Sequence, residues 1–158
     1  MKKFLKWTLS AVIAVFALLQ LFNPSRENPP VANDFITAAQ PPASVAAAIR
    51  AACYDCHSYE TRWPWYSRIA PVSWLVAADV NEGRENFDLS DWPAEPALAA
   101  KKLGRINEEL DYREMPPKKY TLIHAAARLT EAQRKEIMDW TDSTAAKLRG
   151  STNSDAAH

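Results

Sequence analysis

Two cysteines and a histidine occupy one short segment, and they are the residues best suited to chemistry. Cys53 and Cys56 are the only cysteines of the chain, two residues separate them, and His57 follows directly. This Cys-x-x-Cys-His spacing is typical of covalent haem attachment. The two thiols add to the haem vinyl groups as thioethers, and the adjoining imidazole reaches the iron as its proximal ligand. The segment predicts one covalent haem c, with its iron held by His57.

Three other uses of paired cysteines fit the sequence less well. A disulfide between Cys53 and Cys56 closes almost no loop, so it stabilises the fold little. A thioredoxin-like redox pair needs a βαβ context, which the residue pattern lacks. A structural zinc site needs four ligands, and beyond the motif the sequence offers only the isolated His124 and His158.

The sixth coordination position of the iron has two candidate ligands. Met115 lies at the predicted end of a helix, just before Pro116 and Pro117, which stiffen the loop and hold the thioether toward the iron. His124, in an apolar stretch, is the alternative, and an open sixth position is a third arrangement. The choice matters because His/Met ligation raises the reduction potential relative to bis-His ligation. We expect Met115 to be the ligand.

Aromatic and basic side chains near the motif are further candidates for contact with the haem. Five of the six tryptophans lie beyond residue 42, and that much aromatic surface suits a large flat ligand as well as a Trp-rich core. Trp63, Trp65 and Tyr66 follow the motif closely and are candidate walls of the haem pocket. Candidate partners of the haem propionates are Arg62, Arg68, Lys118 and Lys119.

The elements that position these residues are predicted to be helices. Apolar residues recur at helical spacing in four stretches, at about 44–56, 71–83, 91–114 and 130–149. Ser44 and either Ser90 or Asp91 are candidate N-caps, and Thr130 with Gln133 forms a capping box. Only three glycines occur in the chain, which disfavours a hairpin-rich β fold. We expect an all-α, c-type cytochrome-like domain of about four helices around the haem.

The N-terminal segment, residues 1–22, is predicted to be a signal-anchor. Lys2, Lys3 and Lys6 precede an apolar run from Trp7 to Phe22. A charged start followed by an apolar stretch directs a chain to export, and basic residues favour the cytoplasmic side. We expect a single anchor that holds the protein on the periplasmic side of the bacterial inner membrane. The alternative is a cleaved signal that leaves a soluble periplasmic protein.

Three further segments follow the anchor. Residues 23–42 contain five prolines and are predicted to be an extended linker, residues 43–149 the haem-binding domain, and residues 150–158 a disordered tail. The formal net charge is zero. Nucleic-acid binding would call for a basic face, so we expect no nucleic-acid partner.

Longer stretches of sequence accompany the cysteine motif. They are CYDCHS at 53–58, ETRWPWYS at 60–67, IAPVSWL at 69–75, VNEGR at 80–84, DW at 91–92, MPP at 115–117 and the ending from Leu129 to Trp140. Together they resemble the bacterial haem-binding domain family that a CxxCH motif defines. The resemblance implies a small c-type cytochrome-like protein, exported and often membrane-anchored, with haem bound by Cys53, Cys56 and His57. That Met115 is the second ligand remains our inference.

These features favour one-electron transfer with a redox partner in or at the membrane. A haem with both axial positions filled does not bind substrate readily, so its chemistry is electron exchange. The alternative is a haem-based sensor or small-ligand binder with an open or labile sixth site. We expect an electron carrier or haem-binding module rather than an enzyme, because the sequence places no His-Arg pair of the peroxidase kind. A single haem is also thin support for a peroxidase, although the sequence leaves that activity open.

Overall fold

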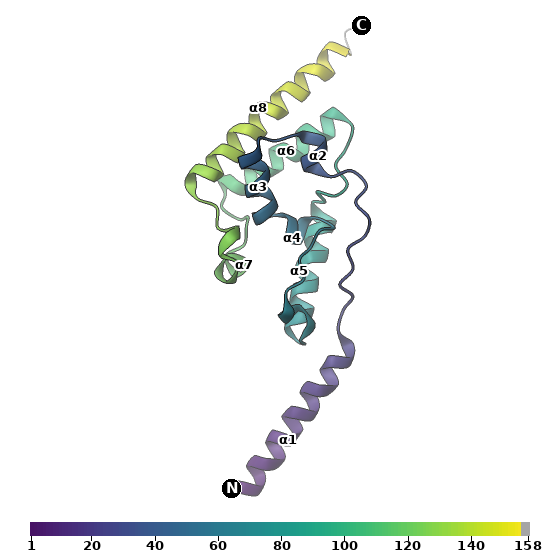
Figure 1. Ribbon diagram of the computed structural model, residues 1–158, viewed down its shortest axis with the longest axis vertical. Helices are drawn as coiled ribbons and strands as arrows, with labels where there is room; N and C mark the ends of the chain where they lie inside the picture. Colours follow the sequence, from purple (N-terminus) through teal and green to yellow (C-terminus); the bar gives the residue numbers. More distant parts are fainter. Residues whose placement is uncertain (156–158) are drawn as a thin grey trace.

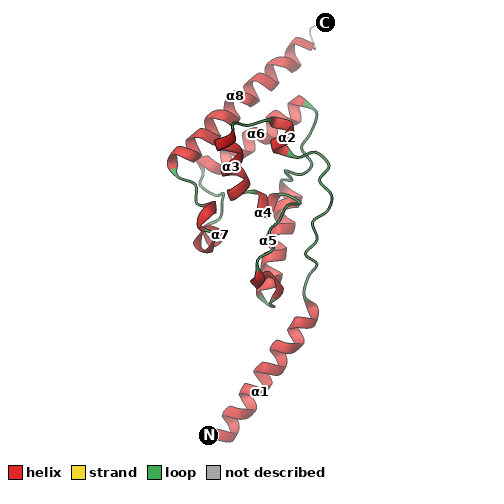
Figure 2. Ribbon diagram, in the orientation of Figure 1, coloured by secondary structure: helices red, strands yellow, loops and turns green. Residues whose placement is uncertain are grey.

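A computed structural model gives the fold of residues 1–155 of the 158-residue chain. Within this range the regular elements are helices, apart from one isolated bridge between Asn33 and Asp91 (Figure 2). The all-α fold predicted from the sequence is confirmed. The elements, in chain order, are α1 Lys2–Leu19, η1 Gln20–Phe22, α2 Phe35–Ala39, α3 Ala43–Ala52, α4 Tyr54–His57, η2 Trp65–Arg68, α5 Val72–Asn86, α6 Pro96–Asp111, α7 Lys118–Ile123, η3 Ala125–Ala127 and α8 Glu131–Asp155.

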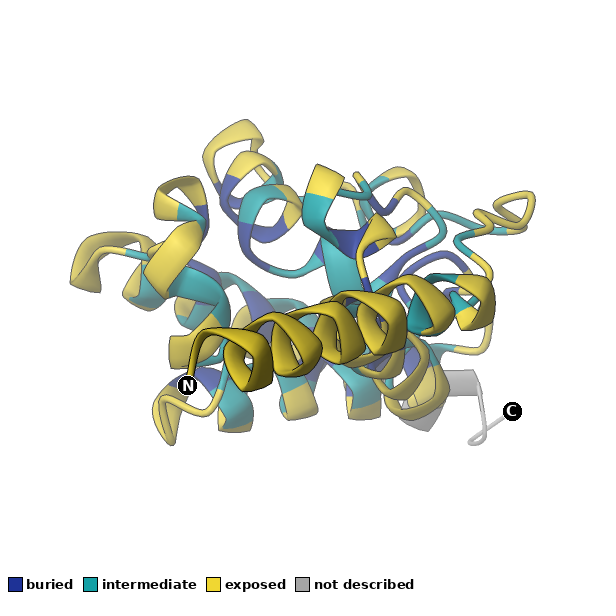
Figure 3. Ribbon diagram, turned by 90° about the horizontal axis from the view of Figure 1, so that it is seen from below, coloured by how far each residue is buried: buried dark blue, intermediate teal, exposed yellow. Residues whose placement is uncertain are grey.

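The helix α1 projects away from the rest of the molecule (Figure 1). Together with η1 it spans the 21 residues Lys2–Phe22, and it is long and apolar enough to cross a membrane. At about 1.5 Å per residue this length matches a hydrocarbon core of about 30 Å. Its side chains are exposed over almost its whole length (Figure 3). A signal sequence has the same character, so α1 is either a membrane anchor or a signal peptide.

The main helix pair of the domain is α6 with α8, and α3 packs across it (Figure 1). Their shared interior contains Leu103 and Leu110 from α6, Ile137 and Ala145 from α8 and Ile49 from α3, all almost fully buried. Apolar residues at helical spacing therefore provide the core, as expected from the sequence. Each buried Leu or Ile stabilises the fold by about 1.5–3 kcal/mol relative to an exposed one. In the described chain that follows α1, the four longest helices are α3, α5, α6 and α8.

The proline-rich segment 23–42 differs from the free linker expected. Its second half folds onto the domain: Asp34 caps α2, and its carboxylate accepts from the Thr37 N–H. Phe35 is completely buried, with its ring 4.5 Å from that of Trp92 and 5.9 Å from that of Trp140. The composition of the segment pointed to an extended chain. The burial of the large Phe35 ring between two tryptophans helps to fix this half of the segment on the domain.

The helix ends agree with the sequence in part. Thr130 and Gln133 form the predicted capping box, because each side chain accepts from the backbone N–H of the other. The first turn of α6 is capped by Glu95 rather than by Ser90 or Asp91, and the N-cap of α3 is Pro42. The Ser44 hydroxyl instead donates to Glu136 of α8, a distant residue that local spacing does not reveal.

The C-terminal stretch also differs from expectation. The predicted haem-binding domain ends at residue 149, yet α8 continues through Gly150 to Asp155. The predicted tail, residues 150–158, is thus helical as far as residue 155, and residues 156–158 lie outside the described part of the chain. An exposed glycine costs a helix only about 1 kcal/mol, which the rest of a long helix tolerates.

Candidate functional site

A cavity of about 320 Å³ lies between α3, α4, α5, α6 and the loop that follows α6. This volume falls within the range of about 300–1,000 Å³ that is usual for cofactor and ligand sites. Four of the residues predicted to hold the haem line it together: Cys53, Cys56, His57 and Met115. Most of the remaining wall is apolar, and it includes Ile49, Phe87, Leu89, Ile106 and Leu110.

The two cysteines stand where α3 gives way to α4. The chain bends at Cys53, and the short helix α4 then carries Cys56 and His57 in its single turn. Both thiols are free. Burial, helped by the proximity of the other thiol, raises the pKa of Cys53 to about 12, and burial with nearby Asp79 raises that of Cys56 to about 11. Redox-active and metal-binding cysteines have a lowered pKa instead. Neutral thiols beside an apolar cavity suit covalent anchors better.

The imidazole of His57 is fixed by two backbone carbonyl groups of α5 and its end. Its Nδ1 atom lies 2.8 Å from the Gly83 oxygen and 2.9 Å from the Phe87 oxygen. A carbonyl oxygen only accepts, so Nδ1 carries the proton and donates. The lone pair therefore resides on Nε2, which is the arrangement that metal-bound histidines use. The Phe87 ring packs edge-on against the imidazole, with 5.9 Å between the centroids.

Gly83 allows this close approach, and reasoning from the sequence missed it. A Cβ atom at this position would lie 2.6 Å from the backbone oxygen of Cys56 and 3.2 Å from the Cys56 Cβ. Contacts that short do not occur, so any other residue would push α4 away from α5. The sequence pattern predicted a helix that ends at Gly83, whereas α5 continues to Asn86. The glycine itself was the available signal, because a glycine inside a helix costs stability and needs a packing reason.

Met115 lies in the loop after α6, and contacts from two helices hold its backbone. Its N–H donates to the Glu109 oxygen at 3.3 Å. From α8, the Arg134 guanidinium donates to the oxygens of Met115 at 3.3 Å and of Leu110 at 2.8 Å. Met115 therefore lines the cavity from a fixed loop. Of the candidates for the sixth position, Met115 is the one that the structure brings to the site.

His124, the alternative ligand, is not among the residues that line the cavity. Its Nδ1 atom lies 3.0 Å from the Tyr120 oxygen and therefore donates. Its Nε2 atom, 2.9 Å from the Tyr66 hydroxyl, accepts from that group. The ring also stacks on Tyr120, with centroids 4.1 Å apart. Both nitrogens have partners, so His124 has no lone pair to offer a metal in this arrangement.

Trp63, Trp65 and Tyr66 are likewise not among the lining residues, so the structure does not bring these predicted wall residues to the cavity. The Trp63 indole donates to the Asn28 side chain, Trp65 is 75% exposed, and Tyr66 is bonded to His124. The loop after the motif instead bonds to the proline-rich segment through Trp63 and to His124 through Tyr66. Proximity to the motif in sequence did not indicate that direction.

Tyr120 and Asp55 form a second support for the motif. Tyr120 lines the cavity, and its hydroxyl donates to the Asp55 carboxylate at 2.7 Å. The backbone N–H and the guanidinium of Arg62 donate to the same carboxylate. Burial favours the neutral form of Asp55, but the bonds from Arg62 and Tyr120 outweigh it, so the pKa of this carboxyl is lowered. Arg62, a predicted propionate partner, is thereby paired with Asp55 of the motif.

Two cations line the cavity, and one of them had been singled out in the sequence. Lys119 was a predicted propionate partner, and it now pairs with Asp79 at 2.6 Å. Arg105, which sequence reasoning missed, lines the opposite part of the wall and donates to the Asn86 oxygen at 3.2 Å. The residues present fit a haem: two thiols, an imidazole with a free Nε2, a thioether, apolar walls and two cations for the propionates.

The fold and this lining define a class of protein, a small all-α domain that binds haem. The chain belongs to the haem-binding domain family, whose model matches residues 14–143. It is also similar to the cytochrome c peroxidase Ccp of Escherichia coli (strain K12), with 30% identity over 112 residues, which cover 67% of this chain and 24% of that protein. The chain thus spans about a quarter of the length of this relative. No solved structure matches the chain.

The similarity to a peroxidase corrects one prediction, namely that the protein is not an enzyme. That prediction depended on the lack of a His-Arg pair in the sequence, and the relative is named for an enzymatic activity. One fold can host many different functional sites. The lack of a His-Arg pair therefore does not prevent a haem domain from contributing to an enzymatic reaction. The prediction of a haem protein is confirmed by the family match.

Proposed function

We propose that the cavity holds one covalently attached haem c and that the domain transfers single electrons. The observation that carries this proposal is the convergence of Cys53, Cys56, His57 and Met115 on one cavity of suitable size. Bound there, the haem iron would supply one-electron exchange. The periodic helices provide the walls, and the chemistry lies in the four side chains that meet inside them.

Each lining group has a role in this proposal. Cys53 and Cys56 would hold the haem through thioether links to its two vinyl groups. His57 would offer Nε2 to the iron, since Nδ1–H is committed to the carbonyls of Gly83 and Phe87. Met115 would offer its sulfur from the loop after α6. Arg105 and Lys119 would pair with the propionates and reduce the cost of bringing two negative charges against an apolar wall.

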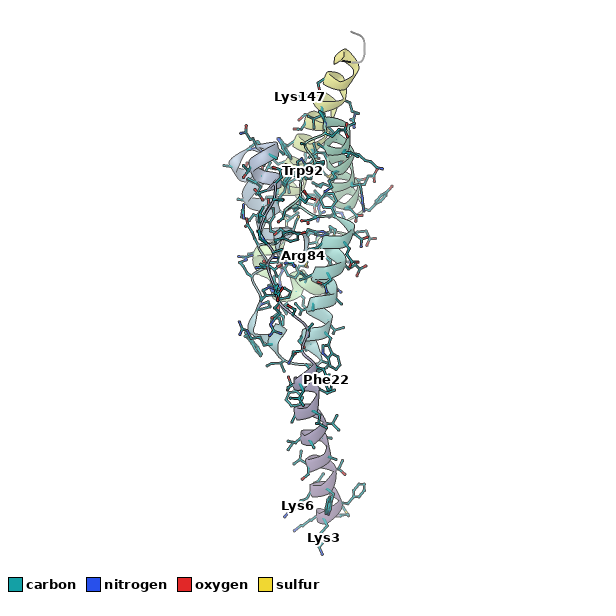
Figure 4. All side chains as sticks on the ribbon, turned by 90° about the vertical axis from the view of Figure 1, so that its right-hand side faces the viewer. Lys3, Lys6, Phe22, Arg84, Trp92 and Lys147 are labelled. Atoms are coloured by element: carbon teal, nitrogen blue, oxygen red, sulfur yellow. The ribbon has the colours of Figure 1, made fainter. Side chains whose placement is uncertain are left out.

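We further propose that α1 anchors the domain on the periplasmic side of the inner membrane. Its length and exposed apolar surface support a membrane span, and Lys3 and Lys6 lie at its free end (Figure 4). Basic residues favour the cytoplasmic side, so the domain would face the periplasm. A redox partner in or at the same membrane would then lie within reach.

Intact mass and the pyridine haemochrome spectrum of the full chain, matured with a haem-attachment system, test the covalent haem. We expect the mass of one haem and a spectrum typical of two thioether links. The variant Cys53→Ala should shift the spectrum to that of a single thioether, and the variant without both cysteines should show no covalent haem. Unmodified mass in the wild-type chain would overturn the proposal.

A second candidate function is a part in peroxide reduction, which the similarity to a cytochrome c peroxidase favours. Turnover of hydrogen peroxide by the reduced protein, compared with free haem, tests it. A rate well above that of free haem would support this function. Carbon monoxide binding separates the remaining alternative: rapid binding at neutral pH would indicate an open or labile sixth site, as in a sensor, and would count against ligation by Met115.

A further inference from the structure

The end of α1 is bonded directly to the domain. The side-chain amide of Gln20 pairs with the backbone of Ala70, accepting from its N–H at 3.0 Å and donating to its oxygen at 3.3 Å. Two residues later, the indole N–H of Trp74 donates to the Phe22 oxygen at 2.8 Å. Phe22 marks this junction in Figure 4. The proline-rich segment is therefore not the only connection between α1 and the domain in the described chain. The end of the domain nearest α1 is also hydrogen-bonded to η1.

Large apolar side chains gather at that same end of the domain. We call this surface the tip face, and it comprises the exposed residues Trp65, Ile69, Val72, Trp74 and Leu75. Trp65 is 75% exposed and Leu75 is 68% exposed. They come from η2, from Ile69 directly after it and from the first turn of α5, which lies beside the end of α1 in Figure 1. Scattered apolar residues need no explanation, but a cluster of this kind marks an interaction surface.

The polarity of α5 changes with distance from α1. One face of the helix is buried through Ser73, Ala77 and Val80. A second stripe carries Val72 and Leu75 near α1, and then Asp79 and Glu82 further along. Because a helix rises about 1.5 Å per residue, the change from apolar to acidic occurs within about 6 Å. A sharp change of this kind is expected where a surface passes from lipid headgroups into water.

The charged residues in the chain segments that form the tip face and α1 are basic. Residues 1–26 contain no Asp or Glu, and neither do residues 61–78, which contain Arg62 and Arg68. Arg68 is exposed beside the tip face, and Arg26 donates to the Ser67 oxygen. Tryptophan with arginine is the composition that anchors proteins at the interface of an anionic membrane. If the tip face bound a protein instead of a membrane, that binding would not require α1 to lack acidic residues as well.

We propose that the tip face lies in the headgroup region of the same bilayer that α1 crosses, so that the domain sits on the membrane in one orientation. This inference depends on the proposed anchoring by α1 and goes beyond it, because an anchor alone leaves the domain free to turn. The cavity then has a defined height: from Leu75 to Gly83 the distance along α5 is about 12 Å. The haem site would stand just outside the membrane surface rather than at the end of a long tether.

We call this position of the tip face in the headgroup region the seat. Spin labels on single introduced cysteines test it in the full chain. The labelled variants are Leu75→Cys on the tip face, Val12→Cys within α1 and, in the last turn of α5, Glu85→Cys, an exposed position that is not among the cavity-lining residues. The haem-loaded protein is reconstituted into vesicles of phosphatidylethanolamine and phosphatidylglycerol. Collision of each label with lipid-soluble oxygen and with a water-soluble nickel chelate is then measured. The wild-type haem-loaded chain is the control. It should take up no label, because the sulfur atoms of its two cysteines are bound to the haem as thioethers.

The seat predicts a graded result. The label at position 12 should prefer oxygen, the label at 85 should prefer the nickel chelate, and the label at 75 should resemble 12 more than 85. Oxygen preference at 12 together with a water-exposed label at 75 would overturn the seat and leave the anchor standing. A water-exposed label at both 12 and 75 would overturn the anchor and the seat together.

A second measurement uses variants that cannot disturb the core, since both altered side chains are exposed. In Trp65→Ser with Leu75→Ser, the label at Ile69→Cys should lose its protection from the nickel chelate, while the label at Val12→Cys should not change. Unchanged protection at position 69 would overturn the seat. A matched pair of exposed apolar residues on α7, Leu122→Ser with Ile123→Ser, should leave the label at 69 unaffected.

Discussion

The Nδ1 atom of His57 lies 2.8 Å from the carbonyl oxygen of Gly83, across the contact between α4 and α5. Gly83 serves this contact twice. Its oxygen accepts the imidazole proton, and the absence of a side chain lets the Cys56 backbone lie against the helix. The tautomer of the histidine and the position of the second thiol therefore depend on one residue 26 positions away from His57.

Substituting Gly83 by alanine should weaken both the fold and the haem site. The new Cβ would lie 2.6 Å from the Cys56 oxygen, so α4 and α5 must separate. Overpacking of this kind costs about 1–3 kcal/mol. We expect a lower urea midpoint and less covalent haem per chain, measured by the pyridine haemochrome spectrum.

Gly104→Ala is the matched control, because a Cβ at Gly104 on α6 meets nothing within 4 Å. In a helix, alanine is more stable than glycine by about 0.5–1 kcal/mol. We therefore expect Gly104→Ala to be neutral or stabilising, with full haem content. Equal effects of the two substitutions would show that the close approach at Gly83 is unimportant.

Replacing Met115 by alanine should remove the second axial ligand and leave the fold intact. The weak near-infrared band of a thioether bound to iron should disappear, and the reduced protein should bind carbon monoxide rapidly. The reduction potential should fall, because loss of the thioether removes what stabilises the reduced iron. Absorption spectra and redox titration of the two proteins measure these changes.

Met138→Ala controls for the loss of a methionine in general. Met138 packs against the core as a partly buried residue of α8 and is not among the lining residues. Its removal should lower stability by up to a few kcal/mol and leave the near-infrared band in place. If that band survives Met115→Ala, another group binds the iron.

The fold and the motif could be predicted from the sequence for the same reason: both are local patterns. Helical spacing places α3, α5, α6 and α8, and the capping box at Thr130 fixes where α8 begins. The Cys-x-x-Cys-His order specifies its own chemistry without knowledge of the fold. Met115 was a good candidate because a proline pair marks the end of the helix before it.

What could not be predicted depends on contacts between distant segments. Phe35 fixes the proline-rich segment by entering a pocket between Trp92 and Trp140, which lie far along the chain. His124 is turned from the cavity by Tyr66, 58 positions away. Arg105 reaches the cavity only because α6 packs beside it. No short-range pattern contains these pairings.

Asp55→Asn should destabilise the protein in a pH-dependent way. The pKa of Asp55 is lowered in the folded state, whereas the unfolded value is about 3.9. The ionised carboxylate therefore contributes stability above about pH 4, and this contribution is lost as the pH falls through the folded pKa. Unfolding free energies of the two proteins should differ at pH 7 and converge toward pH 3.

Asp139→Asn is the comparison for Asp55. Asp139 pairs with Lys135 on the exposed face of α8, where both side chains are mostly in water. Exposed pairs contribute little, so this variant should match the wild type at both pH values. A constant difference between Asp55→Asn and the wild type from pH 7 to pH 3 would rule out the ionised carboxylate as the cause.

Arg84 joins three segments that meet beside the motif. From α5, its guanidinium donates to the Ser58 and Glu27 oxygens at 2.9 and 3.1 Å, and to the side chains of Asn28 and Thr61, both at 2.9 Å. Figure 4 labels Arg84 in the middle of the domain. The proline-rich segment, the loop after the motif and α5 are therefore held by one planar group.

Arg84→Lys keeps the charge and should still loosen the N-terminal segment. A single ammonium cannot reach four acceptors in the directions of a planar guanidinium. Leaving buried acceptors such as the Ser58 oxygen without a donor should cost about 1–3 kcal/mol. We expect a lower urea midpoint and faster proteolytic cleavage at residues 23–34. Arg113→Lys, at an exposed pair with Glu131, should change neither. Unchanged cleavage in Arg84→Lys would mean that the Arg84 guanidinium does not hold the segment on the domain.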